Sequence, residues 1–350
     1  MGSSRPPFVD SDAMTSFPVP SAGRSRALHC PWTIRRLYKS SRDGGESMAA
    51  LYVLVNLIRE RRATAVPAPF DDQMSEIYAP SREAHPMKRG YVDSDWGQVH
   101  YRSAGDNGPA AVFFHESPLS SIAYEAALPH LGKSLRAFAL DTPGYGMSDP
   151  PPSDGFEITH YAAALLRAID GLGIERFAVA GVHTGASLAL EVGLQAGADR
   201  ITCAVLTGVP LMSEERRREF MASWSPPMTP ASDGSHLAWA WERYRRIWGA
   251  DSSAGVLNVG VVQILNVLER YEWAYNAAFR YDPEPRLANL SCPTLLLDAE
   301  NDIFADMDEP AAALLPDARI EIVPGLGGQL PIRVPQTYAE KVIAFVTARS

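Results

Sequence analysis

The stretch of residues 177–191 constrains the fold more than any other part of this sequence. It starts with the apolar run 177–180, which includes a β-branched valine and is typical of a buried strand. Gly181 and Gly185 follow, and an alanine-rich helical pattern begins at once. Glycines at this spacing allow a sharp turn in which the backbone lies close to its neighbours. The stretch therefore predicts a strand, a sharp turn and a helix, with His183 at the centre of the turn.

Strand and helix patterns alternate through residues 87–210 and 288–350. A hairpin is expected at 88–102, and continuous apolar strands are expected at 110–114, 137–140, 177–180, 201–206, 294–297 and 320–323. Helices are expected at 122–131, 158–172 and 335–346. Continuous apolar strands separated by helices are typical of a mainly parallel sheet that helices cover on both faces. The predicted fold class is therefore α/β.

Three segments do not follow this alternation. Residues 1–47 are rich in Ser, Pro, Gly and Arg without a sustained period, and we expect a disordered leader. Residues 48–86 hold short helical patterns and are predicted to form a short helical leader or lid. Residues 211–287 carry helical patterns rich in aromatic residues, and we expect a helical cap inserted into the core. Because a cap over a sheet edge faces the ligand pocket, Trp239 and Trp273 are candidate substrate-binding residues.

Charge and cysteine usage restrict the partners and the location. Residues 90–350 contain 32 acidic and 19 basic residues, which argues against a nucleic-acid partner. The longest apolar run, 49–58, is about half of what a bilayer-spanning helix needs, so no membrane partner is expected. The three cysteines lie far apart without metal-ligand spacing, which favours a cytoplasmic protein without disulfides or a metal site. A small molecule is the expected partner, and a homodimer is left open.

Five motifs occur in a fixed order along the chain. They resemble, in turn, the His-Gly-x-Pro loop, the Asp-x-x-Gly-x-Gly-x-Ser segment, the Gly-x-Nu-x-Gly nucleophile elbow, the acid segment and the histidine segment of the α/β-hydrolase superfamily: residues 115–118, 141–148, 181–185, 292–302 and 323–331. The chain also resembles an atypical bacterial subgroup that has His-Thr-Gly at the elbow. The resemblance covers about residues 87–348 and implies an α/β-hydrolase fold. It places the acid of the site at Asp302.

Three positions depart from the pattern that the resemblance implies. His183 stands at the nucleophile position, Glu116 replaces the loop glycine, and Gly328 stands where the family has its histidine. A Ser-His-Asp triad requires a hydroxyl within hydrogen-bond reach of an imidazole, so that triad is not expected. An imidazole reaches further than a serine hydroxyl, and Gly328 leaves space beside Asp302. We therefore expect His183 to pair with Asp302 as a general base.

The remaining candidates carry supporting roles. Glu116 is either a further catalytic acid or base or is turned away from the site, and His236 of the helical segment is a further catalytic candidate. The backbone N–H groups of Thr184 and Ser117 are the candidate oxyanion donors. By resemblance His115 supports the loop and borders the substrate site. Thr184 as a nucleophile is the alternative to His183 as a base.

The leading interpretation is an atypical α/β-hydrolase-fold enzyme that acts without a cofactor on a small, largely apolar, ester-like or lactone-like carbonyl compound. A cofactor-free lyase, decarboxylase or oxygenase is the alternative within the enzymes, because a base without a nucleophile also suits proton abstraction. A ligand-binding protein that has lost catalysis, with His183 as a remnant, is the alternative from another class.

Overall fold

The computed structural model describes residues 87–249 and 252–349, and the predicted leader segments 1–47 and 48–86 lie outside them. Its centre is an eight-stranded sheet with the order β1-β2-β4-β3-β5-β6-β7-β8. The strands are β1 (Lys88–Ser94), β2 (Gly97–Ala104), β3 (Ala110–Phe114), β4 (Arg136–Leu140), β5 (Phe177–Val182), β6 (Ile201–Thr207), β7 (Thr294–Ala299) and β8 (Ala318–Val323). Each strand expected from an apolar run is present.

Strand direction follows the connections between the strands. The expected hairpin is β1 and β2, which pair antiparallel, and β2 also pairs antiparallel with β4. All later pairs, from β4 with β3 to β7 with β8, are parallel. Parallel strands need a crossover, and most of the crossovers here contain a helix. The prediction of a mainly parallel α/β sheet is therefore confirmed.

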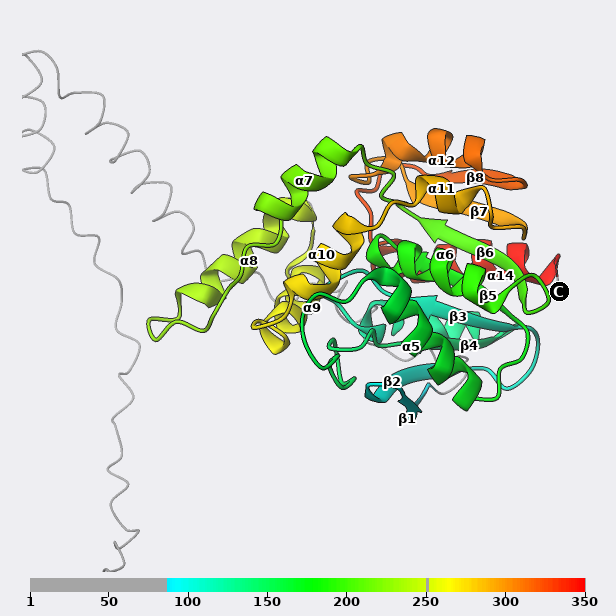
Figure 1. The fold of residues 1–350 in the computed structure, drawn as a ribbon, viewed down its shortest axis with the longest axis horizontal. Helices are drawn as coiled ribbons and strands as arrows, with labels where there is room; N and C mark the ends of the chain where they lie inside the picture. Colours follow the sequence, from blue (N-terminus) through cyan, green and yellow to red (C-terminus); the bar gives the residue numbers. More distant parts are fainter. Residues whose placement is uncertain (1–86, 250–251, 350) are drawn as a thin grey trace, which may run out of the picture. The chain divides into compact units, whose positions relative to one another are not determined.

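Helices cover both faces of the sheet (Figure 1). On one face lie α5 (Ile158–Gly171) and α6 (Thr184–Ala196), and on the other lie α4 (Leu128–Leu131) and α14 (Pro335–Thr347). The expected stripe on α5 is buried, with Tyr161, Leu165 and Ile169 each at most 1% exposed. The central strands β3 and β5 are buried along their whole length, as two-sided coverage requires.

One expected helix is wrong as a continuous element. Residues 122–131 form a short 3₁₀ helix, η1 (Ser121–Tyr124), and then the single turn of α4. Pro129 explains the break, because a proline is tolerated in the first turn of a helix but not in its interior. Three short helical elements were not expected from the sequence: η2 (Ala305–Met307), α12 (Asp308–Leu314) and α13 (Leu330–Arg333).

Residues 211–287 hold helices and, within their described part, no strand. The helices are α7 (Glu214–Ser223), α8 (Ser235–Ile247), α9 (Ala254–Asn266), α10 (Glu272–Arg280) and α11 (Glu284–Leu287). Figure 1 shows α7 to α10 grouped beside the end of the sheet toward which the β6 arrow points. In the described part of the chain no helix is long and apolar enough to cross a membrane.

Candidate active site

The site is centred on the turn between β5 and α6. His183 occupies this turn with φ 49° and ψ −110°, a conformation that non-glycine residues rarely adopt. A side chain at the following Gly185 would meet the Phe114 carbonyl oxygen at 2.0 Å, so the tight approach of helix to strand requires glycine there. The sharp turn predicted from the glycine spacing is therefore present. It projects the His183 imidazole beyond the carboxyl end of the sheet.

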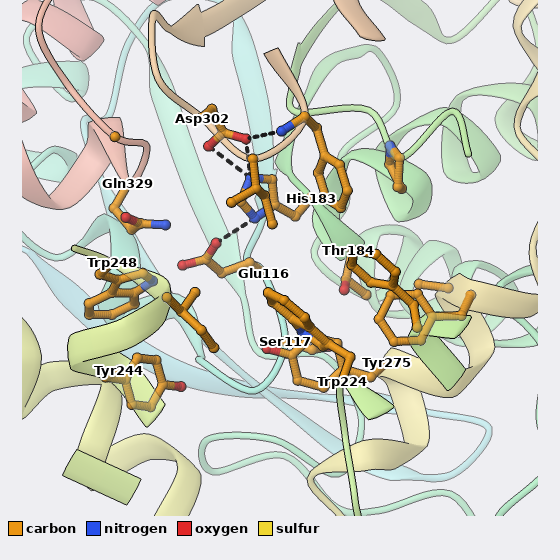
Figure 2. Close-up of a pocket in the computed structure, with 18 residues that line it drawn as sticks. Glu116, Ser117, His183, Thr184, Trp224, Tyr244, Trp248, Tyr275, Asp302 and Gln329 are labelled. Carbon is orange, nitrogen blue, oxygen red and sulfur yellow. Dashed lines mark hydrogen bonds and ion pairs between the residues drawn. The ribbon is translucent and has the colours of Figure 1, made fainter. Parts of the chain in front are cut away.

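Asp302 approaches His183 from the loop after β7. The Nε2 atom of His183 lies 3.0 Å from each oxygen of the Asp302 carboxylate. The backbone N–H of Phe304 donates to Asp302 Oδ1 at 3.0 Å, and the Asp302 side chain is only 1% exposed. The carboxylate is thus held by its own loop and faces the imidazole. The structure brings together the two residues that the sequence predicts as a pair (Figure 2).

Glu116 contacts the other nitrogen of the same ring. It follows β3, and its Oε2 lies 2.9 Å from His183 Nδ1 (Figure 2). Glu116 is therefore not turned away from the site, which was one of the two expected arrangements. His115 supports this position, because Thr142 N–H donates to His115 Nε2 and the opposite nitrogen, Nδ1, lies 2.9 Å from the Glu116 carbonyl oxygen.

The two carboxylates together determine the protonation of the imidazole. Burial alone lowers the pKa of His183, but Asp302 and then Glu116 raise it more, so this pKa lies well above its usual range. For the Asp302 carboxyl group burial acts in the opposite direction and raises the pKa. The positive His183 ring and the Phe304 N–H outweigh burial and keep the pKa of Asp302 below its usual range. A protonated ring donates one N–H to each carboxylate, which satisfies all three groups.

Two further carboxyl groups lie close to Asp302 and have raised pKa values. Burial raises the pKa of Asp298 to about 8, and burial with the nearby Asp302 charge raises the pKa of Asp308 to about 7. Both Asp308 oxygens and Asp298 Oδ2 are buried without a hydrogen-bond partner. Asp302, whose pKa is lowered, is therefore the most acidic carboxyl group of this set and the one that faces His183.

Gly208 and Gly328 have no side chains, and this leaves the space that the side chains of His183 and Asp302 occupy. A Cβ on Gly208 would lie 2.4 Å from His183 Cδ2 and 2.7 Å from Nε2. A Cβ on Gly328 would lie 2.5 Å from Asp302 Oδ2. Real Cβ atoms essentially never come so close, so any side chain at either position would displace the pair. A histidine at position 328 is therefore incompatible with the present position of the Asp302 carboxylate.

An aromatic cavity, partly open to solvent, lies over the side chains of Glu116, His183 and Asp302. Its polar end contains Glu116, His183 and Asp302, and no lysine or arginine is among the described residues that line it. The helical segment and the loops supply its apolar walls: Phe220, Trp224, Tyr244, Ile247, Trp248, Tyr275, Ala278, Phe279, Ile303 and Phe304. Figure 2 shows Trp224, Tyr244, Trp248 and Tyr275 on the side of the cavity opposite Asp302.

The candidate oxyanion donors lie beside the same cavity. Thr184 and Ser117 both line it, and Thr184 is the first residue of α6, whose first N–H groups have no partner within the helix. The Ser117 hydroxyl is buried without a hydrogen-bond partner. The N-terminal end of a helix favours negative charge, so this edge of the cavity suits an oxygen that becomes negative.

The structure keeps four of the predicted site residues out of the cavity lining. His115 is fully engaged in its loop, and His236 lies in the first turn of α8, where its Nδ1 accepts the N–H of Ala231. Trp239 packs against Tyr271 with a ring separation of 5.7 Å. Trp273 is partly buried near the start of α10. None of these four side chains is among the residues that line the cavity.

Several lining residues were missed from the sequence. The rings of Tyr244 and Trp248 lie 4.6 Å apart at a tilt of 59°. The two residues are four positions apart in the sequence, a spacing that puts them on one helix face and was available as a signal. Trp224 and Tyr275 were not distinguishable from other aromatic residues of their segment. Gln329 follows Gly328 in the loop after β8. A polar residue at the end of a strand was a signal that could have identified it as a lining residue. No group of metal-ligating side chains suited to an ion occurs within residues 87–249 and 252–349.

Comparison with known proteins identifies several enzymes to which this chain is similar. Haloalkane dehalogenase 2 of Mycobacterium bovis is 29% identical over 133 residues, which span 38% of this chain and only 46% of that relative. The non-heme haloperoxidase of Rhodococcus erythropolis is 26% identical over 255 residues, which span 67% of this chain and 90% of that relative. These relatives are enzymes of different activities, so they do not by themselves assign one to this chain.

Solved structures show the likeness of the fold. The enol-lactonase from Burkholderia xenovorans superposes with a TM-score of 0.63 at 19% identity, covering 74% of this chain and 100% of the enzyme. A thermophilic esterase from Thermogutta terrifontis gives a TM-score of 0.63 at 20% identity, covering 75% of this chain and 100% of the esterase. The finer resemblance to a subgroup with His-Thr-Gly at the elbow stays a prediction. Because the family model for the alpha/beta hydrolase fold matches residues 112–326, well over half of the sequence, the chain belongs to the α/β-hydrolase fold family.

Proposed function

We propose that this protein is a hydrolase of small, uncharged, largely apolar esters or lactones, and that its own side chains activate the attacking water. The observation that carries the proposal is the imidazole held between Glu116 and Asp302 at the polar end of the aromatic cavity. Membership of the α/β-hydrolase fold family supports a hydrolytic reaction. An enol-lactonase and an esterase among the structures of the same fold make esters and lactones the first substrates to test.

Glu116 is the group that takes the proton from water in this proposal. Both nitrogens of His183 are engaged by carboxylates, and its pKa is raised, so the ring is already protonated at neutral pH. Glu116 pairs with His183 through Oε2 and also lines the cavity, so its carboxylate is the basic group within reach of a bound water. The proposal thus moves the role of base from His183, where the sequence analysis expected it, to Glu116, and keeps His183 and Asp302 as the other two members of the site.

His183 has an electrostatic role in the same step. Its positive charge lies between the two carboxylates and beside the edge of the cavity where Thr184 begins α6. When water attacks a carbonyl carbon, the carbonyl oxygen becomes negative, and an imidazolium with a helix N-terminus offsets that charge. The protonated ring also keeps Glu116 from opposing the oxyanion. Asp302 fixes the orientation of the ring from the opposite side.

The cavity wall supports the proposed substrate class. Its lining is mostly aromatic, and it presents two carboxylates to one imidazole without a lysine or arginine among the described lining residues. Burying a substrate carboxylate without a cationic partner is costly. We therefore place neutral apolar esters and lactones ahead of anionic ones.

A screen with matched variants tests the function. The purified protein is incubated with uncharged aryl esters, alkyl esters and lactones, and release of acid or phenol is measured. We expect turnover by the unchanged protein and by the control variant Glu340→Gln on the exposed face of α14, but not by Glu116→Gln or His183→Ala. Equal turnover by all four proteins would show that the activity does not come from this site.

Proton abstraction from carbon is the second candidate function. The elbow presents no hydroxyl at residue 183, so the same base could remove a proton beside a carbonyl, as in a lyase or decarboxylase reaction. Reaction in isotope-labelled water separates the two chemistries. Hydrolysis places oxygen from the labelled water in the product acid, whereas proton abstraction places solvent deuterium on carbon and leaves the oxygen atoms unchanged.

A further inference from the structure

Arg243 is a buried cation without a carboxylate partner. It lies on α8 and is only 4% exposed. Its Nη1 donates a hydrogen bond to the Trp224 carbonyl oxygen at 2.7 Å, while its Nε and Nη2 are buried without a hydrogen-bond partner. No carboxylate pairs with it in the part of the chain that the structure describes. An arginine stays charged in proteins, and a buried charge without an ionic partner is costly, so other interactions must offset this cost.

Four aromatic rings surround the guanidinium. Its central carbon lies 5.7 Å from the ring centroids of Trp224, Trp239 and Tyr271, and 5.8 Å from that of Tyr275. A cation over an aromatic ring at this distance is attracted by the ring, and this attraction offsets part of the cost of burial. The positive charge of Arg243 is therefore held among α7, α8 and α10, where these rings lie.

Two of these rings separate the guanidinium from the cavity. Trp224 and Tyr275 line the cavity (Figure 2), whereas Arg243 is not among the lining residues, so its charge lies behind the wall. A ligand group packed against the cavity side of either ring lies about 4 Å from that ring, and hence about 10 Å from the guanidinium. At about 10 Å two unit charges in a protein change a binding constant by about tenfold. The charge of Arg243 can therefore influence which ligands the cavity accepts.

Without Arg243 the cavity would favour a cation. Glu116, Asp302 and a protonated His183 together carry one net negative charge. Aromatic rings beside a negative charge are typical of sites for quaternary ammonium groups. Arg243 adds one positive charge behind the wall, so the charges of these four side chains sum to zero.

We propose that Arg243 is a specificity-determining residue that makes the cavity select neutral esters over cationic ones. This inference rests on the proposed hydrolase function and adds the exclusion of positively charged substrates. Arg243 takes no part in the reaction itself and acts on the ligand through its charge. The three residues at the polar end of the cavity keep the roles described above.

Two esters of the same shape test the selection during turnover. In 3,3-dimethylbutyl acetate a quaternary carbon stands where acetylcholine has its positively charged nitrogen. Release of acetic acid from each ester gives the ratio of the two kcat/KM values. We expect the unchanged protein to favour the neutral ester at least about tenfold, and Arg243→Gln to reduce this ratio about tenfold. A preference of the unchanged protein for acetylcholine would overturn the proposal, and this measurement needs no variant.

Two further variants separate the charge of Arg243 from its packing. Arg243→Lys and Arg243→Gln both shorten the side chain and keep an N–H donor, but only Arg243→Lys keeps the charge. Arg246→Met removes a positive charge from an exposed position of the same helix. We expect Arg243→Lys and Arg246→Met to keep the preference of the unchanged protein. Equal loss in Arg243→Lys and Arg243→Gln, or equal loss in Arg246→Met, would contradict the inference.

A binding experiment tests the same selection without turnover. Choline and 3,3-dimethylbutan-1-ol form a second matched pair of a cation and a neutral molecule. The change in tryptophan fluorescence reports their binding, since Trp224 and Trp248 line the cavity. We expect the unchanged protein to bind the neutral alcohol more tightly, and Arg243→Gln to reduce the ratio of the two dissociation constants about tenfold. An unchanged ratio in a folded Arg243→Gln protein would count against the role of Arg243.

The two experiments distinguish the failure of each proposal. If no ester is hydrolysed but the preference for the neutral alcohol depends on the charge at residue 243, the proposed function fails and the selection by Arg243 stands. If esters are hydrolysed with a ratio that does not depend on this charge, the hydrolase proposal stands and the inference on Arg243 fails. Thermal unfolding of all variants establishes that the folded state is intact in each comparison.

Discussion

His183 and the two carboxylates beside it form a unit with one proton more than a neutral histidine would carry. Both ring nitrogens lie about one hydrogen-bond length from a carboxylate oxygen, at 2.9 Å and 3.0 Å. The side chains of all three residues are at most 14% exposed, so solvent screens their charges only weakly. Removal of His183 leaves two buried carboxylates without their shared partner, and removal of either carboxylate changes the protonation of the ring, which is why the three residues are expected to act together.

Substitution of the three residues should show that they act as a unit. We expect Glu116→Gln, His183→Ala and Asp302→Asn each to reduce kcat/KM by ~10² to 10⁴ on any substrate found. The double variant Glu116→Gln with His183→Ala should be little worse than the worse single variant, because the groups work in one step. Steady-state kinetics on the singles and the double provide the measurement. Losses that multiply in the double variant would mean that the residues act independently.

The protonation of His183 is testable without any substrate. The carboxylates hold its pKa well above the usual 6.5, so the ring should be doubly protonated at pH 7. Replacing Glu116 by Gln removes one of the two negative charges and should lower this pKa. Nuclear magnetic resonance of isotope-labelled histidine side chains follows both ring nitrogens during a pH titration. A neutral ring at pH 7 in the unchanged protein would exclude Glu116 as the base that this arrangement favours.

The turns at the carboxyl ends of the strands make room for this unit. The loop after β6 contains Gly208 at φ 59°, and the loop after β8 contains Gly328 at φ 95°. Each glycine lies against one member of the pair formed by His183 and Asp302. An imidazole at the elbow therefore depends on small residues in two neighbouring loops, and these residues would have no such role in a site that has merely lost its serine.

Gly208→Ala should disable the site more than it destabilises the fold. The new Cβ would meet the His183 ring at 2.4 Å, so the ring must leave its place between the carboxylates. Gly173→Ala is the matched control, since Gly173 has φ 69° but nothing within 4 Å of an added Cβ. Both variants should lose about 1 kcal/mol of stability from the left-handed backbone. We expect the loss of kcat/KM, of about 10²-fold or more, only in Gly208→Ala, as measured by kinetics and denaturant unfolding of both variants.

The same measurement identifies the contrary result. If Gly173→Ala loses activity as strongly as Gly208→Ala, backbone strain accounts for the effect and contact with His183 does not. If neither variant loses activity, the ring tolerates displacement and its place between the carboxylates is not required.

The whole molecule has a stability that depends on pH through its buried carboxyl groups. The pKa of Asp308 is about 7 in the folded protein, whereas its ordinary value is 3.8. Between these two pH values the Asp308 carboxyl group is protonated in the folded protein and ionised in the unfolded chain. The stabilisation from that proton is complete below pH 3.8 and is lost as the pH rises to about 7. His183 adds to the loss above pH 6.5, because its folded-state pKa is also raised.

Asp308→Asn should therefore stabilise the protein at neutral pH. The amide is neutral at every pH, so the free energy of unfolding of the variant, relative to the unchanged protein, should rise by about 1 to 3 kcal/mol between pH 4 and pH 7 and then stay constant. Asp199→Asn is the control, since Asp199 is exposed and is not among the charges that raise the pKa of Asp308. Urea unfolding at several pH values measures the difference. A difference that does not change with pH would show that Asp308 is ionised in the folded protein.

The sequence alone determined the fold class and the location of the site in it. Apolar runs set the strands, because a strand buried on both faces needs apolar residues along its length. The spacing of Gly181 and Gly185 set the turn that carries His183. The order of the motifs placed Asp302 and Glu116 at the ends of strands. These are local properties, or properties of the order of elements, and the chain carries them without reference to its packing.

Only the tertiary structure decided which side chains meet. Whether Glu116 contacts His183 or turns away depends on a rotamer that three loops set together, and the sequence left both arrangements open. The choice of Trp224 and Trp248, and not Trp239 and Trp273, as cavity residues depends on how α7, α8 and α10 are rotated against the sheet edge. The role of Gly208 follows from a contact across distant loops, which no local pattern records. Packing selects among faces that the sequence makes equally apolar, and for that reason these features could be found only in the folded molecule.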